Sequence, residues 1–151
     1  GCVDIVQAEG ARRYSGGWPT SGSAGSRDAL RFAVRAAKIL GQPADPQWSR
    51  VADSLRIPFD KKTGTHPEYD GYAGKKAKQA DVVLMRYPWE NPQSADVTRA
   101  DMAYYVPRTD PDGPSMTDSV HSIISSELGD PGCAAMTYTK RSADPFIRAP
   151  Y

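Results

Sequence analysis

Large aliphatic side chains and phenylalanine are scarce in this sequence. Of its 151 residues only 23 are Leu, Ile, Val or Phe, whereas there are 13 glycines and 13 prolines. Such a shortage is typical of disordered chains when the net charge is also high. Here the net charge is +1, and three Trp and eight Tyr are present. We therefore expect an ordered chain with a small core of its own, as in a fragment that completes its core with further sequence.

Cysteine, excess charge and long apolar runs are lacking as well. Cys2 and Cys133 are too few for a disulfide scaffold and do not have metal-ligand spacing, and whether they pair is left open. The 19 Lys and Arg residues balance 18 Asp and Glu residues, so no net charge attracts nucleic acid. No run approaches the ~18 apolar residues of a membrane span. We expect no nucleic-acid or membrane partner, no metal and no cofactor, and the composition leaves the cellular compartment open.

The regular elements that the sequence predicts are helices. A stripe of Ala29, Ala33, Ala36, Ala37 and Leu40 predicts a helix that starts after Ser26 and stops at Gly41. Asp45 and Pro46 then start a second helix with Trp48, Val51, Ala52 and Leu55 on one face, so the two form an αα-hairpin. A further helix is predicted from Ser94 or Asp96 to about Tyr105, with Val97, Ala100 and Tyr104 on one side. Two more are predicted over Thr117–Leu128, with Val120, Ile123, Ile124 and Leu128 on one face, and over Cys133–Arg141.

Long polar loops separate these helices. Residues 1–26, 58–76 and 107–115 are rich in Gly, Pro, Ser and Asp and are predicted to be irregular. Loops of this length in an ordered chain are usually functional. The sequence therefore predicts an all-α fold with an irregular segment over 1–26 and helical hairpins over 27–151.

One loop carries two carboxylates, Glu68 and Asp70, together with His66 and two tyrosines. In an extended segment, residues i and i+2 point the same way and lie roughly 6–7 Å apart. That separation suits an acid and base pair acting on a glycosidic bond. The alternative is that Asp70 and Gly71 form a turn while Glu68 is solvated, and the spacing leaves both interpretations open.

Three polar residues, Lys78, Gln79 and Asp81, stand at the start of an otherwise apolar run that ends at Pro88. A cation, an amide and a carboxylate there can form paired hydrogen bonds with sugar hydroxyls, which need both donors and acceptors. They can equally cap a helix. His121 lies on the stripe of its helix, where a lone histidine is usually a packing residue. Phosphate-binding glycine loops, zinc signatures and serine-nucleophile elbows are absent from the sequence.

The sequence resembles glycoside hydrolase family 65, which holds acid trehalases, glucosidases acting on glucosylgalactosyl-hydroxylysine, and disaccharide phosphorylases. The similarity lies first in Val51–Asp60 and in the His-Pro-Glu-Tyr-Asp-Gly-Tyr run at 66–72. It continues in the Lys-Gln-Ala-Asp run at 78–81, which Tyr87–Pro88 follows. Two later segments also resemble the family, the Gly-Pro-Ser-Met-Thr run at 113–117 and residues 145–150. The Lys-Gln-Ala-Asp run is the most specific of these marks. The resemblance covers roughly residues 27–151.

This resemblance implies an (α/α)6 barrel several times longer than the chain, of which residues 27–151 would be a portion. It implies an inverting hydrolase of trehalose or a related α-glucoside, in which Lys78 and Gln79 hold hydroxyls of the glucosyl unit. His66, Glu68, Asp70, Met116 and Thr117 are then expected in the wall of the site, without a catalytic role for either carboxylate. The partners implied are an α-glucoside and the remainder of the barrel, in a secreted, vacuolar or lysosomal setting.

Two acids carry the chemistry of inverting glycosidases. By resemblance the general acid should precede the Ala29–Leu40 helix, where Glu9 is the nearest carboxyl group, but the family's Pro-Asp-Glu-Tyr context and Asn pair are missing. The base should follow Tyr151. The 151 residues alone are therefore expected to be inactive.

Two alternatives to a hydrolase stay open. Family phosphorylases place a serine pair where this chain has Pro114, which disfavours a phosphorylase. A carbohydrate-binding or structural chain without catalysis is the other alternative, because residues 1–26 depart from the family pattern.

Overall fold

The structure is a computed structural model that describes residues 19–79, 81–110 and 112–149. Its regular elements within these ranges are helices, with two isolated β-bridges and no β-strand. The all-α class predicted from the sequence is confirmed. Glu9 and Cys2 lie outside the described residues.

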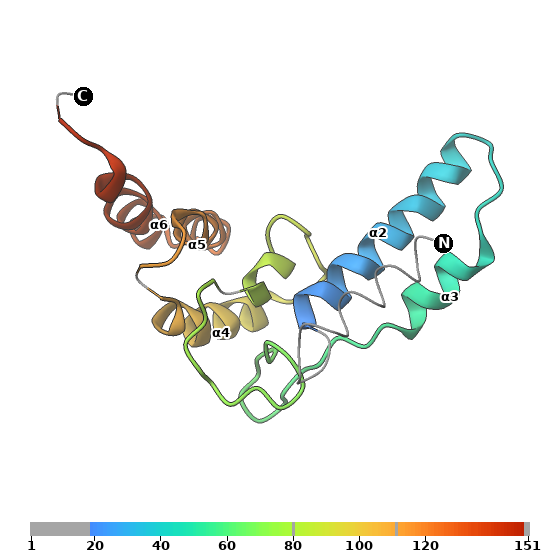
Figure 1. Ribbon diagram of the computed structural model, residues 1–151, viewed down its shortest axis with the longest axis horizontal. Coiled ribbons are helices and arrows are strands. Elements are labelled where there is room, and N and C mark those ends of the chain that lie inside the picture. Colours follow the sequence, from blue (N-terminus) through green and yellow to red (C-terminus); the bar gives the residue numbers. More distant parts are fainter. Residues whose placement is uncertain (1–18, 80, 111, 150–151) are drawn as a thin grey trace.

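The first two helices of the described residues, α2 (Thr20–Ile39) and α3 (Pro46–Ser54), form the expected antiparallel hairpin at one end of the molecule (Figure 1). The Asp45 side chain caps α3 by accepting a 2.8 Å hydrogen bond from the Gln47 N–H, with Pro46 as the first helical residue. Gly41 ends the preceding helix with a φ of +64°, a conformation that side chains other than glycine rarely adopt. Both signals were read correctly from the sequence.

The start of α2 was predicted wrongly, because the helix begins at Thr20 and includes the Ser-Gly-Ser-Ala-Gly-Ser run. The predicted boundary at residue 26 falls inside it. Serine and glycine are weak helix formers, but small residues allow close packing here: a Cβ on Gly25 would lie 3.0 Å from the ring of Trp89. Ala24 is fully buried, whereas Ala29 and Leu40 of the predicted stripe are exposed. Packing therefore overrides propensity at this end of the helix.

A short 3₁₀ helix, η1 (Asp81–Met85), lies at the centre of the core. Its buried side chains Val82, Val83 and Met85 pack between α2, α4 and α5. The rest of the core comes from the following helices and from α2: Ala24, Met102, Tyr105, Val120 and Ile124. Because the Lys-Gln pair ends two positions before Asp81, the first residue of η1, the best-packed part of the chain supports it.

Helix α4 (Ala95–Tyr105) begins with the predicted cap, in which the Ser94 hydroxyl oxygen accepts a 3.2 Å hydrogen bond from the Val97 N–H. The side that carries Val97, Ala100 and Tyr104 is not the most buried side of this helix. The helix buries Thr98, Asp101, Met102 and Tyr105, whereas Val97, Ala100 and Tyr104 are half-buried. Apolar spacing failed because this helix faces a polar loop, and the side that makes hydrogen bonds is the side that is buried. The 3₁₀ turn η2 (Val106–Arg108) follows.

Helices α5 (Ser115–Glu127) and α6 (Pro131–Thr137) pack together at the other end of the molecule (Figure 1). The expected stripe on α5 is confirmed, with Val120 and Ile124 buried and Gly129 ending the helix at a φ of +81°. After α6 the chain continues through a π-helical turn, η3 (Tyr138–Ala143), and a 3₁₀ turn, η4 (Asp144–Phe146).

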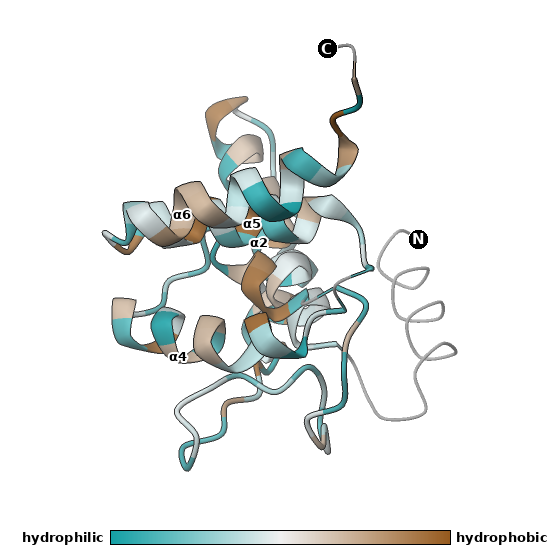
Figure 2. Cartoon of the chain, turned by 90° about the vertical axis from the view of Figure 1, so that its left-hand side faces the viewer, coloured by the Kyte–Doolittle hydropathy of each residue, from teal (hydrophilic) through white to brown (hydrophobic). Residues whose placement is uncertain are grey.

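Much of the apolar surface is not covered. Figure 2 shows hydrophilic colours over most of the chain, with apolar residues in short stretches. On the outer part of α2, Phe32 is 64% exposed and Ile39 is 84% exposed, and near the end of the described chain Phe146 and Ile147 are about as exposed as Phe32. The small core expected from the composition is therefore what the structure has.

Candidate functional site

The Lys-Gln pair at 78–79 is held in place by the loop that follows α4. Ala77 forms a parallel bridge with Thr109. The Ala77 N–H donates to the Arg108 carbonyl (3.0 Å), and the Ala77 carbonyl accepts from the Asp110 N–H (2.9 Å). This bridge fixes the backbone one residue before Lys78, on a segment that otherwise has no regular structure.

Gly113 packs directly against the backbone of Lys78. A Cβ on Gly113 would lie 2.4 Å from the Lys78 carbonyl oxygen and 2.9 Å from that of Asp110. Contacts that short do not occur, so only glycine fits without a backbone shift. The Gly-Pro-Ser-Met-Thr run of the sequence thus begins in contact with the Lys-Gln run.

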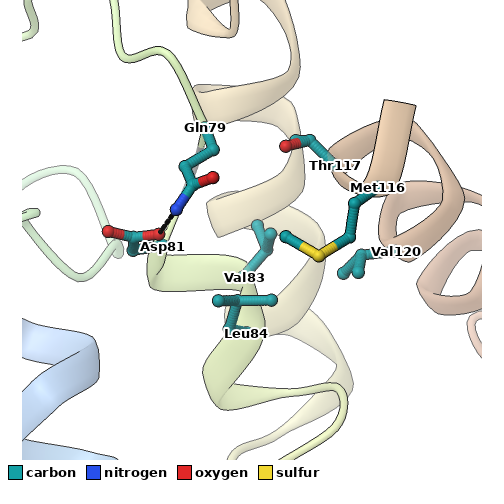
Figure 3. Close-up of a pocket in the computed structure, with 7 residues that line it drawn as sticks. All are labelled: Gln79, Asp81, Val83, Leu84, Met116, Thr117 and Val120. Carbon is teal, nitrogen blue, oxygen red and sulfur yellow. Dashed lines mark hydrogen bonds between the residues drawn. The ribbon is translucent and has the colours of Figure 1, made fainter. Parts of the chain in front are cut away.

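A small pocket lies where these two runs meet. It is lined by side chains from the segment before η1, from η1 and from α5 (Figure 3): Gln79, Asp81, Val83, Leu84, Met116, Thr117 and Val120. Its volume of about 10 Å³ has room for about one water molecule. The Gln79 side-chain amide donates a 3.0 Å hydrogen bond to the Asp81 carboxylate. The buried Thr117 hydroxyl has no partner among the described residues. Donors and acceptors thus converge at the edge of the core, in a form suited to hydroxyl groups.

Glu68 has a largely buried side chain next to Asp81. Burial above all, and then the negative charge of Asp81, raise the pKa of Glu68 to about 7, although the backbone N–H groups of Asp81 and Val82 act in the opposite direction. Burial also raises the pKa of the Asp81 carboxyl group, and its hydrogen bond from Gln79 lowers it. Two partly desolvated carboxyl groups therefore stand together at the start of η1.

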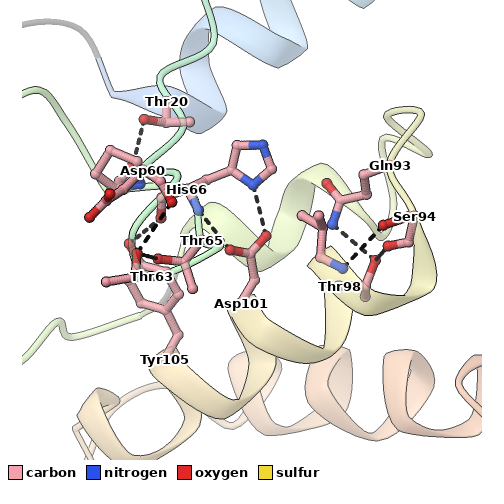
Figure 4. Close-up of polar contacts among 12 residues, drawn as sticks. Thr20, Asp60, Thr63, Thr65, His66, Gln93, Ser94, Thr98, Asp101 and Tyr105 are labelled. Atoms are coloured by element: carbon pink, nitrogen blue, oxygen red, sulfur yellow. Dashed lines mark hydrogen bonds and ion pairs between the residues drawn. The ribbon is translucent and has the colours of Figure 1, made fainter.

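A separate buried network joins the same loop to α4 (Figure 4). The Asp101 carboxylate accepts 2.8 Å hydrogen bonds from the His66 N–H and, when Nδ1 carries the proton, from the imidazole ring. The Tyr105 hydroxyl donates to the His66 carbonyl at 2.8 Å. His66 is 8% exposed and Asp101 is 2% exposed. This network locks the loop onto α4 and explains the polar inner side of that helix.

The structure brings together part of the predicted site. Gln79, Met116 and Thr117 line one pocket, Lys78 is exposed beside it, and Glu68 adjoins Asp81. His66 does not line the pocket. Nor does Asp70, which is exposed and pairs with Arg56 at 2.6 Å. Glu68 and Asp70 thus have different surroundings, and Gly71 has the positive φ of a turn.

Sequence reasoning missed the contributions of Asp101 and Tyr105, and it missed that Glu68 adjoins Asp81. Asp101 and Tyr105 are one helical turn apart, which places them on the same side of α4. Both side chains are polar, so apolar spacing does not indicate that this side of the helix is buried against the His-Pro loop. Contact between Glu68 and Asp81 has no such signal, since the segment between them is irregular.

A second, larger cavity of about 480 Å³ lies between α4, α5 and α6. His121 lines it, and both ring nitrogens of this buried side chain have no partner among the described residues. Burial lowers the pKa of His121, the Asp118 carboxylate raises it, and the Arg141 guanidinium lowers it. Cys133 is exposed at the same cavity.

The described part of the chain contains no group of three His, Cys, Asp or Glu side chains that could hold a metal ion. None of its helices has the length and apolar character needed to span a bilayer.

Comparison with known proteins found similar sequences of two kinds. The chain is 42% identical to the protein-glucosylgalactosylhydroxylysine glucosidase of Mus musculus over 119 residues, which are 78% of the chain and 17% of that protein. It is 43% identical to the protein of the same name in Danio rerio over 102 residues, 67% of the chain and 16% of that protein. It is 31% identical to a cell wall acid trehalase of Arthroderma benhamiae over 125 residues, 81% of the chain and 12% of that protein.

The chain is similar to one segment of glucosidases and acid trehalases. It spans about a sixth of the length of the two glucosidases and less of the trehalase. No model of a known protein family matches the chain. The matched segment covers most of the described structure, so the Lys-Gln pair and its pocket belong to a chain with curated glucosidase relatives.

Proposed function

We propose that these 151 residues are part of a glycoside hydrolase of family 65, an inverting enzyme that releases glucose from trehalose or a related α-glucosyl disaccharide unit. Support comes from glucosidase and acid trehalase relatives at 31–43% identity. Because the chain corresponds to a small share of each relative, the enzyme as a whole extends beyond these residues in this proposal, and the helical hairpins form one portion of an (α/α)6 barrel. The 151 residues alone would be inactive.

One observation carries the proposal: the two family-like runs meet. Gly113 touches the Lys78 backbone, and Met116 and Thr117 share a pocket with Gln79. In the proposed site Lys78 supplies a charged donor and Gln79 supplies both a donor and an acceptor to hydroxyls of the glucosyl unit. A site of this kind rejects a sugar whose hydroxyl is misplaced, because its buried polar groups then lose their partners.

The described residues of this chain would bind and orient the glucosyl unit, while two carboxylic acids outside the described residues protonate the leaving oxygen and activate water. Glu68 and Asp70 are not proposed for either task. Glu9 keeps the place of a candidate general acid and lies outside the described residues. The base is proposed to lie in sequence that follows Tyr151.

The decisive experiment uses the full product of the gene that carries this sequence. Its intact mass is expected to be several times 16.4 kDa. Incubated with trehalose and with glucosyl-galactose in phosphate-free buffer, it should release glucose. From glucosyl-galactose, proton NMR at early times should show β-glucose first because an inverting enzyme changes the configuration, and from trehalose it should show equal amounts of both anomers because the leaving glucose keeps its α configuration. Early release of α-glucose alone from either substrate would contradict the inverting mechanism, and release of no glucose from any α-glucoside would contradict the hydrolase.

The same assay separates the two alternatives. Turnover that requires inorganic phosphate and yields a glucose phosphate would show a phosphorylase. Pro114 stands against this outcome because it replaces the first residue of the expected serine pair, and it directly precedes α5. Binding of glucose or trehalose without any turnover would show a carbohydrate-binding chain.

A further inference from the structure

The backbone around Glu68 is clamped on two sides. The His66 carbonyl accepts the hydrogen bond of the Tyr105 hydroxyl from α4. The Pro67 carbonyl accepts from the Thr20 hydroxyl, and the Glu68 carbonyl accepts from the Thr20 N–H at 2.9 Å, both from the first residue of α2. Three consecutive carbonyls are thus bonded to helices, and the point from which the Glu68 side chain projects is fixed.

From that point the Glu68 carboxyl group reaches the start of η1. One of its oxygens is buried without a partner among the described residues. The groups that shift its pKa are the Asp81 carboxylate, whose charge raises it, and the backbone N–H groups of Asp81 and Val82, which lower it, so the carboxyl group lies near the first residues of η1. The charged or titratable groups that act on it are Asp81 from η1, Tyr72 from its own loop and Tyr105 from α4. No cation of the described residues is among them, so within this part of the chain an ionised Glu68 would stand against a second carboxylate without a counter-ion.

Asp81 links this acid to the sugar site. Its carboxylate accepts the 3.0 Å hydrogen bond of the Gln79 side-chain amide. A neutral Glu68 can donate its O–H to a neighbouring acceptor and leaves Asp81 free to stay ionised, whereas an ionised Glu68 repels Asp81 and disturbs the carboxylate that orients Gln79.

We propose that Glu68 is a positioning residue for the Gln79 site and that it acts as a neutral carboxylic acid, holding Asp81 and the first turn of η1 so that the Gln79 amide faces the sugar. The role in sugar binding rests on the proposed function, whereas the role in holding η1 does not. The midpoint of the change is expected near pH 7, in agreement with the raised pKa of Glu68. Affinity for the glucoside should therefore fall as the pH rises through 7.

The test compares Glu68→Gln, Glu68→Ala and wild type in the full gene product, with Asp70→Asn as the matched control, an exposed acid two residues away in the same loop. The wild-type KM for trehalose is expected to rise about tenfold from pH 6 to pH 8.5, the size of one lost hydrogen bond. Glu68→Gln should keep the low KM and abolish this rise, Glu68→Ala should raise KM about tenfold at every pH, and Asp70→Asn should follow the wild type.

A second readout needs no enzyme activity. Amide hydrogen exchange of the peptide that covers η1, corrected for the intrinsic exchange rate at each pH, should be about tenfold faster in Glu68→Ala than in the wild type below pH 7. In the wild type and in Asp70→Asn alike, the corrected exchange should be faster above pH 7 than below it. In Glu68→Gln it should stay slow. Loss of affinity in Glu68→Gln equal to that in Glu68→Ala would overturn the proposal, and so would unchanged exchange and KM in both variants. If the wild type hydrolyses no glucoside, the exchange result decides the positioning role while the proposed function fails alone.

Discussion

Single residues in this chain differ in what their loss should affect. Gln79 lines the pocket and should matter for substrate binding, whereas Asp101 is 2% exposed and does not line the pocket. The two groups are therefore expected to give different signatures, one in kinetics and the other in stability.

Replacing Lys78 or Gln79 by alanine should lower kcat/KM for the α-glucoside by about 2–4 kcal/mol of transition-state stabilisation, because a charged or forked hydrogen bond to the sugar is lost. Steady-state kinetics of the full gene product measure this. Lys75→Ala, an exposed lysine of the same segment, should leave kcat/KM unchanged. Equal turnover of the wild type and both site variants on every accepted α-glucoside would remove these residues from the site.

Replacing Asp101 by alanine should destabilise the protein by about 3 kcal/mol or more, because the buried His66 N–H and ring nitrogen both lose their acceptor. Asn in the same place should cost less, since its carbonyl can accept from the backbone and its amide can donate to the other histidine tautomer. Thermal inactivation midpoints of the full gene product give the order wild type, Asp101→Asn, Asp101→Ala. Equal midpoints for the three proteins would show that the network does not hold the loop.

The stability of the protein is expected to depend on pH through the buried His121. Its pKa in the fold is lowered by burial, so the stability it provides is fully present above its unfolded value near 6.5 and is lost as the pH falls through the folded value. His121→Leu should therefore lose less thermal stability than the wild type between pH 7 and pH 5. An identical loss in both proteins would contradict this role.

At the scale of elements, the short helix η1 and the loop after α4 decide the shape of the site. The loop supplies a bridge to Ala77 and the close approach of Gly113, and η1 anchors the other side in the core. The Lys-Gln pair is thus held between two segments that are distant in sequence.

Gly113→Ala should disturb this arrangement, because its Cβ would meet the Lys78 carbonyl at 2.4 Å and the backbone must move. Overpacking of this kind costs about 1–3 kcal/mol, and we expect it to appear as a lower kcat/KM for the glucoside. Gly132→Ala is the matched control, since a Cβ there meets nothing within 4 Å. Kinetics in which the two alanine variants behave alike would show that the close approach does not position Lys78.

At the scale of the whole molecule, the core is too small for the chain. Its helices expose Phe32, Ile39 and Leu40 on α2 and Met136 and Tyr138 near the other end. Ordering costs about 1.5 kcal/mol per residue, and burial returns about 25 cal/mol per Å² of apolar surface. A chain with so few large aliphatic residues gains little free energy from the burial of apolar surface.

Residues 1–151 expressed alone are therefore expected to bind a hydrophobic dye, to have weak near-ultraviolet circular dichroism and to lack a sharp thermal transition. Adding the remaining segments of the proposed barrel should restore all three properties. A cooperative transition of the monomeric chain, with an enthalpy near ~0.7 kcal/mol per residue, would contradict this expectation and favour an autonomous helical domain.

The sequence by itself determined the helices whose ends carry a chemical signal. Asp45 and Pro46, Ser94, Gly41 and Gly129 act within one turn of their own position, so α3, α4 and the ends of α2 and α5 could be predicted at those points. It also singled out Gln79, Met116 and Thr117, which line one pocket, while their role in substrate binding stays a prediction.

Tertiary structure alone decided the rest, because the deciding contacts join residues far apart in the chain. The Ser-Gly-Ser-Ala-Gly-Ser run became helix since its small residues fit under Trp89 and against η1, against their intrinsic preference. The inner side of α4 was set by the loop at His66 rather than by apolar spacing. Glu68 was placed beside Asp81 by hydrogen bonds from Thr20 and Tyr105 that clamp its loop. Local propensity carries no information about such partners, and burial beside them is what changes the chemistry of a carboxyl group.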